Sequence, residues 1–289
     1  MAINLASNLT AIANNFILAA KLTERDSTVM RPLVRVIPMK KGVNQIDLPK
    51  FGTVSVAALT DGVDLATPTS FTPSSTTFTA SERGAMIVIT DKAMRESQDL
   101  VGQLASRELG RAWGYDQDTQ LFSNFDSFSA SIGAAGTEIT AKYILAGHAL
   151  LHGNSTQPVP TDGKISAVLH SFQAYELQSN LTLPGTSNVP TDLQNDLIKR
   201  LFVARIFEVD VFQSKDITVD GSDDAKGALF HQDAIVLVEQ QAMRVRQQRD
   251  ESLRATEFVL VGDWGHGIWE NEWGVELLFD AATPSGTTH

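Results

Sequence analysis

Cysteine is absent from the 289-residue sequence. Disulfide bonds and cysteine-ligated metal sites are therefore excluded, and nothing points to an oxidising compartment. Long hydrophobic runs are missing as well. Residues 1–26 have no basic start, and polar residues interrupt their apolar positions, which is typical of neither a signal peptide nor a membrane span. We predict a helix over residues 2–22 and a protein that folds in the cytosol.

Positive charge is scarce. The chain has 23 Lys and Arg against 34 Asp and Glu, which gives a formal net charge of −11. A protein that wraps nucleic acid needs basic surfaces that displace counterions from phosphates, so this balance argues against such a role. The remaining composition, 43% hydrophobic and 20% charged, is that of an ordinary globular protein with enough core for one large domain or two smaller ones.

Charge of either sign is absent from Ala66–Ser81, which consists mostly of Thr and Ser. Its only large side chains are Phe71 and Phe78. Of the flanking segments, residues 45–60 alternate as a half-buried strand does, and residues 85–90 form a compact apolar strand. A long hairpin of this kind is marginal on its own, and an unpaired edge invites another chain. We therefore expect a second copy to cover this arm, with Phe71 and Phe78 as aromatic anchors on the neighbour.

Helices and strands occupy separate parts of the sequence, which predicts an α+β fold with mostly antiparallel pairing. Thr90 and Asp91 have the character of an N-cap, and Thr140 of another. We predict helices over 98–125, 141–153, 171–180 and 191–206, and strands over 165–171, 207–217, 228–240, 242–250, 255–264 and 274–281.

Candidate catalytic groups are few. His148 and His152 lie at i, i+4 on one predicted helix face, which is metal-ligand spacing, but the zinc-protease motif needs a Glu where Ala149 stands. A metal-dependent hydrolase is kept as a remote alternative to two histidines on a helix surface. The sequence has no nucleophile elbow and no phosphate-binding loop. We therefore predict no catalytic residues, no metal and no cofactor.

The stretch 262–274 combines tryptophans with His266, Glu270 and Glu272. Carboxylates among aromatic rings can bind sugars or act as an acid–base pair. The favoured interpretation is a turn between two strands whose tryptophans pack in the core or against a neighbour.

Residues 244–250, "RVRQQRD", form a small basic cluster in this acidic chain. Alternation of Arg244 and Arg246 along a strand is typical of a solvated face or an ion-pairing site between subunits. Contact with phosphate is the less favoured alternative.

The order of these elements resembles that of the major capsid proteins of tailed bacteriophages, whose shell fold is shared with encapsulins. Residues 45–97, "QIDLPKFGTVSVAALTDGVDLATPTSFTPSSTTFTASERGAMIVITDKAMRES", look like the extended loop of that family running into its long spine helix. Residues 228–280, "ALFHQDAIVLVEQQAMRVRQQRDESLRATEFVLVGDWGHGIWENEWGVELLFD", look like its peripheral-domain sheet. Trp264 and Gly265 stand where the family usually has Tyr-Gly or a similar pair.

The resemblance implies a set of domains. These are an N-terminal arm (1–44), an extended β-hairpin loop (45–90), a peripheral domain with the spine helix (91–137 and 228–289) and an axial domain (138–227). Some family members carry an N-terminal scaffolding segment. Because this chain begins almost directly with the arm, the scaffold is expected to be a separate protein.

The resemblance also implies a structural role. Many copies would form pentamers and hexamers that close into an icosahedral shell around double-stranded DNA, bound without sequence specificity, in the virion. Separate scaffolding and portal proteins are expected partners, with room for decoration proteins and no membrane. Some members crosslink a loop Lys to a neighbour's Asn. Lys50 lies in that region, but no motif identifies its partner, so it is expected only as a subunit contact. An encapsulin-like cargo compartment is the alternative within the same fold.

Overall fold

The computed structural model describes most of the chain from residue 28 onward. The described residues are 23, 28–40, 42–50, 56, 58, 73–96, 100–154, 157, 159–181, 202–206 and 208–284. The predicted helix over residues 2–22 and the position of Phe71 lie outside them. None of the helices within the described part is both long and apolar enough to cross a membrane.

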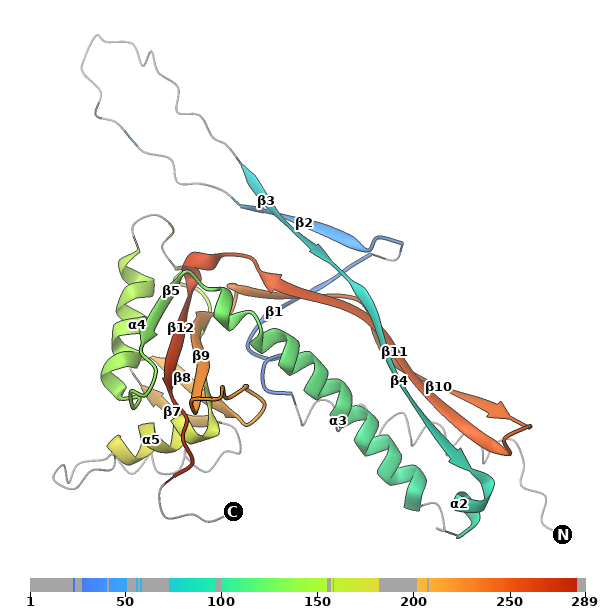
Figure 1. Cartoon of the computed structure of the whole chain (residues 1–289). Helices are drawn as coiled ribbons and strands as arrows, with labels where there is room; N and C mark the ends of the chain where they lie inside the picture. Colours follow the sequence, from blue (N-terminus) through green and yellow to red (C-terminus); the bar gives the residue numbers. More distant parts are fainter. Residues whose placement is uncertain are drawn as a thin grey trace.

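A long four-stranded sheet, here called sheet A, forms one half of the body. Its strand order is β1 (Arg35–Pro38), β10 (Ile235–Asp250), β11 (Ala255–Ile268) and β4 (Ser81–Thr90). The pairs β10–β11 and β11–β4 are antiparallel, and β1 runs parallel to β10. Helix α3 (Leu100–Phe122) runs beside this sheet, after the short helix α2 (Asp91–Glu96) at its far end (Figure 1). The long predicted helix is thereby confirmed, with slightly shorter bounds.

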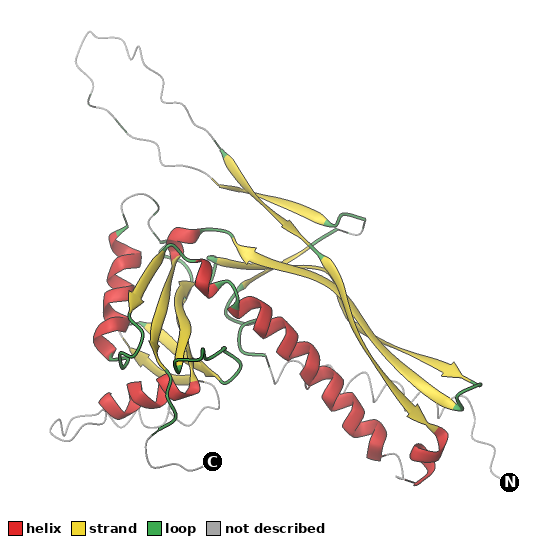
Figure 2. Ribbon diagram, in the orientation of Figure 1, coloured by secondary structure: helices red, strands yellow, loops and turns green. Residues whose placement is uncertain are grey.

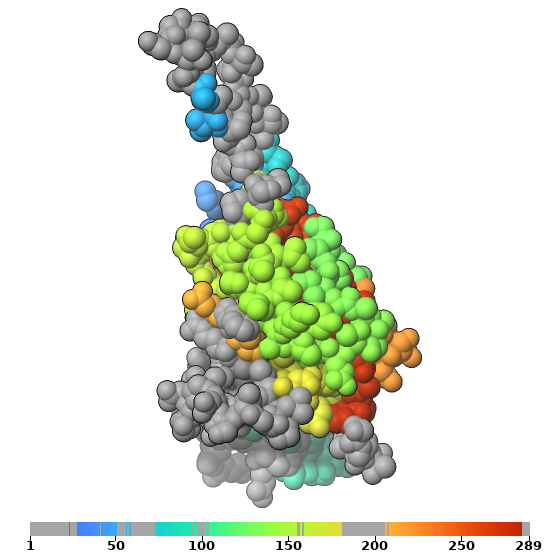
Figure 3. All heavy atoms as spheres, turned by 90° about the vertical axis from the view of Figure 1, so that its left-hand side faces the viewer, coloured from blue at the N-terminus to red at the C-terminus, as the bar shows by residue number. Residues whose placement is uncertain are grey.

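A six-stranded sheet, here called sheet C, forms the other half (Figure 2). In order across the sheet, its strands are β5 (Ala130–Gly133), β12 (Gly274–Asp280), β9 (Asp224–His231), β6 (Ile165–His170), β8 (Val209–Ser214) and β7 (Phe202–Ile206). Helices α4 (Ala141–Gly153) and α5 (Ser171–Leu181) pack on one of its faces. In the view of Figure 3, α4 (yellow-green) covers much of the surface. Because β5 and β12 pair into this sheet, the expected boundaries of an axial domain at 138 and 227 run through it.

One core joins the two sheets. The face of sheet C opposite α4 and α5 contributes Val168 and Phe230 to the same cluster as Leu109 and Trp113 of α3 and Leu260 of β11. A second cluster lies under α4 and α5 and includes Ile144, Leu177 and Leu277. The alternation of buried residues on β6, where neighbouring side chains enter different clusters, follows from the period of two along a strand.

A two-stranded hairpin projects from this body (Figures 1 and 2). Strand β2 (Gln45–Lys50) pairs antiparallel with β3 (Ser74–Thr79), from Gln45 opposite Thr79 to Lys50 opposite Ser74. Strand β3 leads through Ala80 directly into β4 of sheet A. The predicted strand pairing at the base of the arm is therefore observed, whereas most of residues 51–72 lie outside the described part of the chain.

Two predicted elements differ from the structure. The helix predicted over 191–206 is wrong at its end, where Phe202–Ile206 is strand β7, paired with β8. A place beside β8 overrides the local helical pattern, because β-branched and aromatic residues fit a pleated edge. The runs 228–240 and 242–250 also divide differently: a turn after His231 ends β9, and β10 continues from Ile235 to Asp250 through two irregularities of register.

The predicted N-caps behave differently from each other. Thr90 precedes α2, and its Oγ1 accepts a hydrogen bond from the N–H of Ala93 at 3.3 Å, as a capping side chain does. Thr140 occupies the N-cap position of α4 with extended backbone, but its side chain makes no capping hydrogen bond.

A buried carboxylate attaches the segment before β1 to helix α3. Asp118 is fully buried, and its two oxygens accept hydrogen bonds from the N–H groups of Val29, at 2.7 Å, and Met30, at 3.1 Å. Burial raises the pKa of Asp118 to about 7, the nearby charge of Asp216 adds to the rise, and the two backbone hydrogen bonds oppose it. Keeping the buried carboxyl group of Asp118 charged therefore costs folding free energy.

This burial predicts a pH dependence of stability. The folded pKa is raised above the ordinary value of 3.8, so the folded state binds the proton more tightly. Stability from this group is full below pH 4 and is lost as the pH rises to about 7, at up to roughly 1.4 kcal/mol per pH unit. Asp118→Asn, which is always neutral, should remove that loss.

The measurement is urea unfolding of wild type and Asp118→Asn at pH 5 and pH 8. The variant's stability relative to wild type should be more favourable at pH 8 than at pH 5, by about 2 kcal/mol. Other titrating groups cancel in this difference. An equal difference at the two pH values would contradict the assignment.

Candidate functional site

The two predicted histidines share a cavity at one side of sheet C. His148 and His152 lie on α4 with ring centroids 4.4 Å apart, so the predicted shared face is confirmed. The cavity has a volume of about 330 Å³, and its polar lining also includes Lys164, Glu208 and Asp210. Burial lowers the pKa of His148, and the neighbouring His152 lowers it further, against a smaller opposing effect of Glu208. No group of three His, Cys, Asp or Glu that could hold a metal occurs among the described residues.

The tryptophan-rich stretch is a strand end and a turn. Strand β11 runs to Ile268, and a 3-10 turn (Asn271–Trp273) leads into β12. Trp264 is 1% exposed, and Trp269 and Trp273 meet edge to face at 5.9 Å. This agrees with the interpretation of a turn with packed tryptophans.

The carboxylates of this stretch do not face each other as an acid–base pair would. Glu270 forms an ion pair with Lys50 at 3.7 Å, and Glu272 accepts a hydrogen bond from Nδ2 of Asn154 at 2.5 Å. Burial lowers the pKa of His266, whose Nδ1 lies 3.0 Å from Nδ2 of Asn124. Each of these polar groups is therefore used within the subunit.

Two predicted contact residues lie on the paired strands of the hairpin. Lys50 ends β2, and its ion pair with Glu270 connects the hairpin to the turn after β11. Phe78 of β3 is 3% exposed and packs with Met39, Val236 and Val238. The expectation that the Phe78 ring anchors the arm on a neighbour therefore needs correction. Its area is already buried in its own subunit, because β3 crosses sheet A before it leaves the body.

Arg244 and Arg246, the other predicted contact residues, are exposed on β10. They lie opposite Val261 and Val259 of β11, which in turn lie opposite Gly84 and Met86 of β4. The structure therefore places both arginines beside a row of apolar side chains. Met86 is 58% exposed and Val88 is 41% exposed, although residues 85–90 were predicted as a compact apolar strand. An apolar run of this kind does not say which face of the strand is covered.

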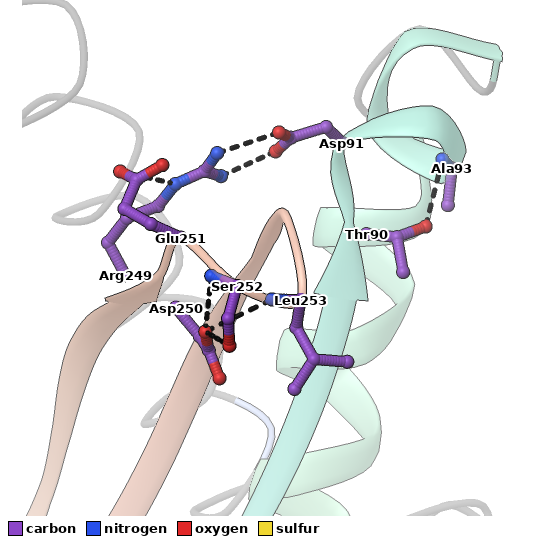
Figure 4. A network of polar contacts seen from close by, with 8 residues as sticks. All are labelled: Thr90, Asp91, Ala93, Arg249, Asp250, Glu251, Ser252 and Leu253. Carbon is purple, nitrogen blue, oxygen red and sulfur yellow. Dashed lines mark hydrogen bonds and ion pairs between the residues drawn. The ribbon is translucent and has the colours of Figure 1, made fainter.

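The turn between β10 and β11 is held by a polar network (Figure 4). Arg249 donates two hydrogen bonds to Asp91 of α2, at 2.5 and 2.7 Å, and a third to Glu251 at 3.2 Å. These bonds from Arg249 are the main reason why the pKa of Asp91 is lowered. Asp250 accepts hydrogen bonds from Ser252 and Leu253, which hold the turn closed. Arg249 therefore acts within its own subunit.

Comparison with solved structures identifies the fold of this chain. No protein-family model matches the chain, and no curated protein sequence matches it. Among solved structures, the capsid asymmetric unit of cyanophage Pam1 matches with a TM-score of 0.67 and 13% identity, over 91% of this chain and 93% of that one. A structure of Mycobacterium phage Che8 matches with a TM-score of 0.66 and 16% identity, over 86% and 90%.

A virus-like particle from Pyrococcus furiosus matches with a TM-score of 0.60 and 11% identity, over 91% of this chain and 98% of that one. The chain thus has the α+β fold of phage capsid structures over nearly its whole length.

The burial of Phe78 generates a prediction about the subunit itself. Phe78→Ala should lower the free energy of unfolding of the dissociated subunit by about 3 kcal/mol or more, because it leaves a cavity between β3 and β10. The measurement is chemical unfolding followed by circular dichroism. Val56→Ala is the control: Val56 is 97% exposed, so its loss should change stability by less than about 0.5 kcal/mol. Equal stability of wild type and Phe78→Ala would contradict the burial.

Proposed function

We propose that this chain is a capsid protein, many copies of which form pentamers and hexamers that close into an icosahedral shell around the double-stranded DNA of a tailed phage. The observation that carries the proposal is the hairpin β2–β3, which leaves the body of the subunit (Figure 1). Beyond Lys50 the chain continues with an aliphatic side chain, Val56, that is 97% exposed in the single subunit.

The physical cost of such a hairpin supports a partner of the same kind. An isolated two-stranded hairpin is marginal in water. The described part of this hairpin is held on the subunit's own sheet A through Ile46, Leu48 and Phe78. A shell contains many copies, so each hairpin can rest on a neighbour while its own subunit receives another. The match to the cyanophage Pam1 capsid over nearly the whole of both chains is consistent with this use of the fold.

The two halves of the body are proposed to make different contacts in the shell. Sheet C with α4 and α5 is proposed as the axial domain that meets its copies at the centre of each pentamer or hexamer. Sheet A with α3 is proposed as the peripheral domain. Leu145 and Leu150 of α4 are 42% and 49% exposed, which leaves apolar surface on the proposed axial half.

The charge of the chain fits a container. With a formal net charge of −11, the subunit repels polyanions, so DNA is held by enclosure without sequence-specific contacts. A wall that does not grip DNA lets the genome enter and leave. Scaffolding and portal proteins are the proposed partners, with room for decoration proteins, and the virion is the proposed location.

A structural role also agrees with the contacts that the carboxylates after β11 make. The carboxylates Glu270 and Glu272 are engaged with Lys50 and Asn154, so they do not form an acid–base pair. We therefore assign no catalytic activity to this chain. A cargo compartment with the same fold is the alternative, and the contents of purified particles distinguish it: packaged genome for a capsid, enclosed protein for a compartment.

Removal of the projecting part of the hairpin tests assembly. Residues 51–73 are replaced by a short Gly-Ser turn, so that β2, β3 and the buried Phe78 remain. The variant should keep the circular dichroism spectrum of the folded subunit but form no closed shells by electron microscopy, with or without a scaffold. Shells of normal stability would contradict the proposed function, and so would a wild-type protein that stays monomeric under all conditions.

A further inference from the structure

Two histidines of helix α4 belong neither to the core nor to the proposed function. The buried residues of this helix are Ile144, Gly147 and Leu151, of which Ile144 and Leu151 pack in the cluster against sheet C. His148 follows Gly147 and His152 follows Leu151, so both lie at the border between the buried and the exposed face of the helix. His148 is accordingly half-buried, and His152 is exposed.

The separation of the two rings suits one metal ion bound by both. Residues four apart are neighbours on a helix surface, and the ring centroids of His148 and His152 are 4.4 Å apart. Two nitrogens bound to one tetrahedral zinc ion, each at about 2.0–2.1 Å, lie about 3.3 Å from each other. Small rotations of two rings at the observed separation bring their nitrogens to that distance.

The two rings line a cavity with room for an ion and its remaining ligands. It measures about 330 Å³ and lies between α4, the segment before β6 and the turn between β7 and β8. A water molecule takes up about 30 Å³ in the liquid, so several waters fit beside an ion. Water oxygens can therefore complete the coordination. This agrees with the finding that no three His, Asp or Glu residues of the described chain are placed to hold a metal together.

The charges around the cavity favour a cation. Glu208 and Asp210 contribute two carboxylates, against the single ammonium group of Lys164. Burial lowers the pKa of His148, which keeps a nitrogen electron pair available at neutral pH. Imidazole suits zinc, copper and nickel, whereas calcium and magnesium prefer oxygen ligands. This combination selects a divalent transition metal.

We infer that His148 and His152 bind one divalent transition-metal ion, such as zinc, with water completing its coordination and the negative charge of Glu208 nearby. The zinc-protease motif is not required for this. Where that motif has a Glu, this chain has Ala149, which removes the base that would activate water but neither of the two ligands. The site is a property of the subunit itself and does not depend on the proposed function.

Zinc titration tests the site. Protein without a polyhistidine tag is titrated with zinc chloride against a chromophoric chelator that reports free zinc. We expect about one ion per chain, with no competition from magnesium chloride. His148→Ala and His152→Ala should each weaken zinc binding by roughly tenfold or more, since each removes one of the two ligands. Circular dichroism checks folding, and because His152 is exposed, His152→Ala is expected to fold as the wild type does.

Stability gives a second measurement on the same proteins. An ion that binds the folded chain more tightly than the unfolded chain stabilises it by mass action. Zinc should therefore raise the urea concentration at which the wild type unfolds, and should leave that of His152→Ala unchanged. An equal rise in both proteins would contradict the site.

A shifted histidine provides the matched control. His152→Ala with Gly153→His keeps the number of histidines but places the second ring five residues after His148, on a different side of the helix. A Cβ at Gly153 would meet no neighbouring atom within 4 Å, so the structure tolerates this change. The variant should bind zinc as weakly as His152→Ala. Binding as tight as that of the wild type would show that the paired rings are not the ligands.

Two single changes test the charge of the cavity in opposite directions. Glu208→Gln removes a negative charge and should weaken zinc binding, whereas Lys164→Gln removes a positive charge and should strengthen it. Glu108→Gln on α3 changes the net charge as Glu208→Gln does, but Glu108 does not line the cavity, so zinc binding should stay the same. Equal effects of the two glutamate changes would remove Glu208 from the site.

Copper(II) in place of zinc identifies the ligands directly. Its electron paramagnetic resonance spectrum should show coupling to both imidazoles in the wild type and to a single imidazole in His152→Ala. Metal binding that is unchanged in both alanine variants, or a copper spectrum without imidazole nitrogen, overturns the site and leaves the capsid role standing.

Discussion

The close approach of β11 to its neighbours is the constraint on which the rest of the structure depends. A Cβ at Gly262 would lie 2.8 Å from the ring of Trp113, and one at Gly265 would lie 2.1 Å from the carbonyl oxygen of Thr79. Both distances are shorter than atoms tolerate, so only glycine lets β11 pass between α3 and the base of the hairpin. The strand thereby joins the long helix, sheet A and the projecting arm into one body, with Trp264 buried between them.

This arrangement satisfies one face of sheet A and leaves the other open. Every second residue on β10, β11 and β4 enters the core with α3. The residues between them, including Met86, remain in contact with solvent. A monomer gains nothing from such a surface, because exposed apolar side chains cost solubility.

Ion pairs formed by arginines connect the elements of the subunit. Arg249 is paired twice with Asp91, and Arg83 pairs with Asp116 while its guanidinium lies 4.8 Å from the ring centre of Trp264. These pairs are partly exposed, so each contributes little to stability but fixes the orientation of the elements it joins. Arg244 and Arg246 face away from this framework.

Local patterns in the sequence determined the elements whose cause is local. Apolar spacing identified the long helix around Trp113, Thr90 was identified as an N-cap by its hydroxyl, and alternation identified the strands of the hairpin. An α+β fold and its resemblance to phage capsids followed from the order of these elements. Tertiary structure alone decided that Phe202–Ile206 is a strand, that β5 and β12 belong to sheet C, and that Phe78 is buried while Met86 is exposed. The physical reason is that a period of two separates the faces of a strand but carries no information about which face is covered, since pairing and packing partners come from residues far away in the chain.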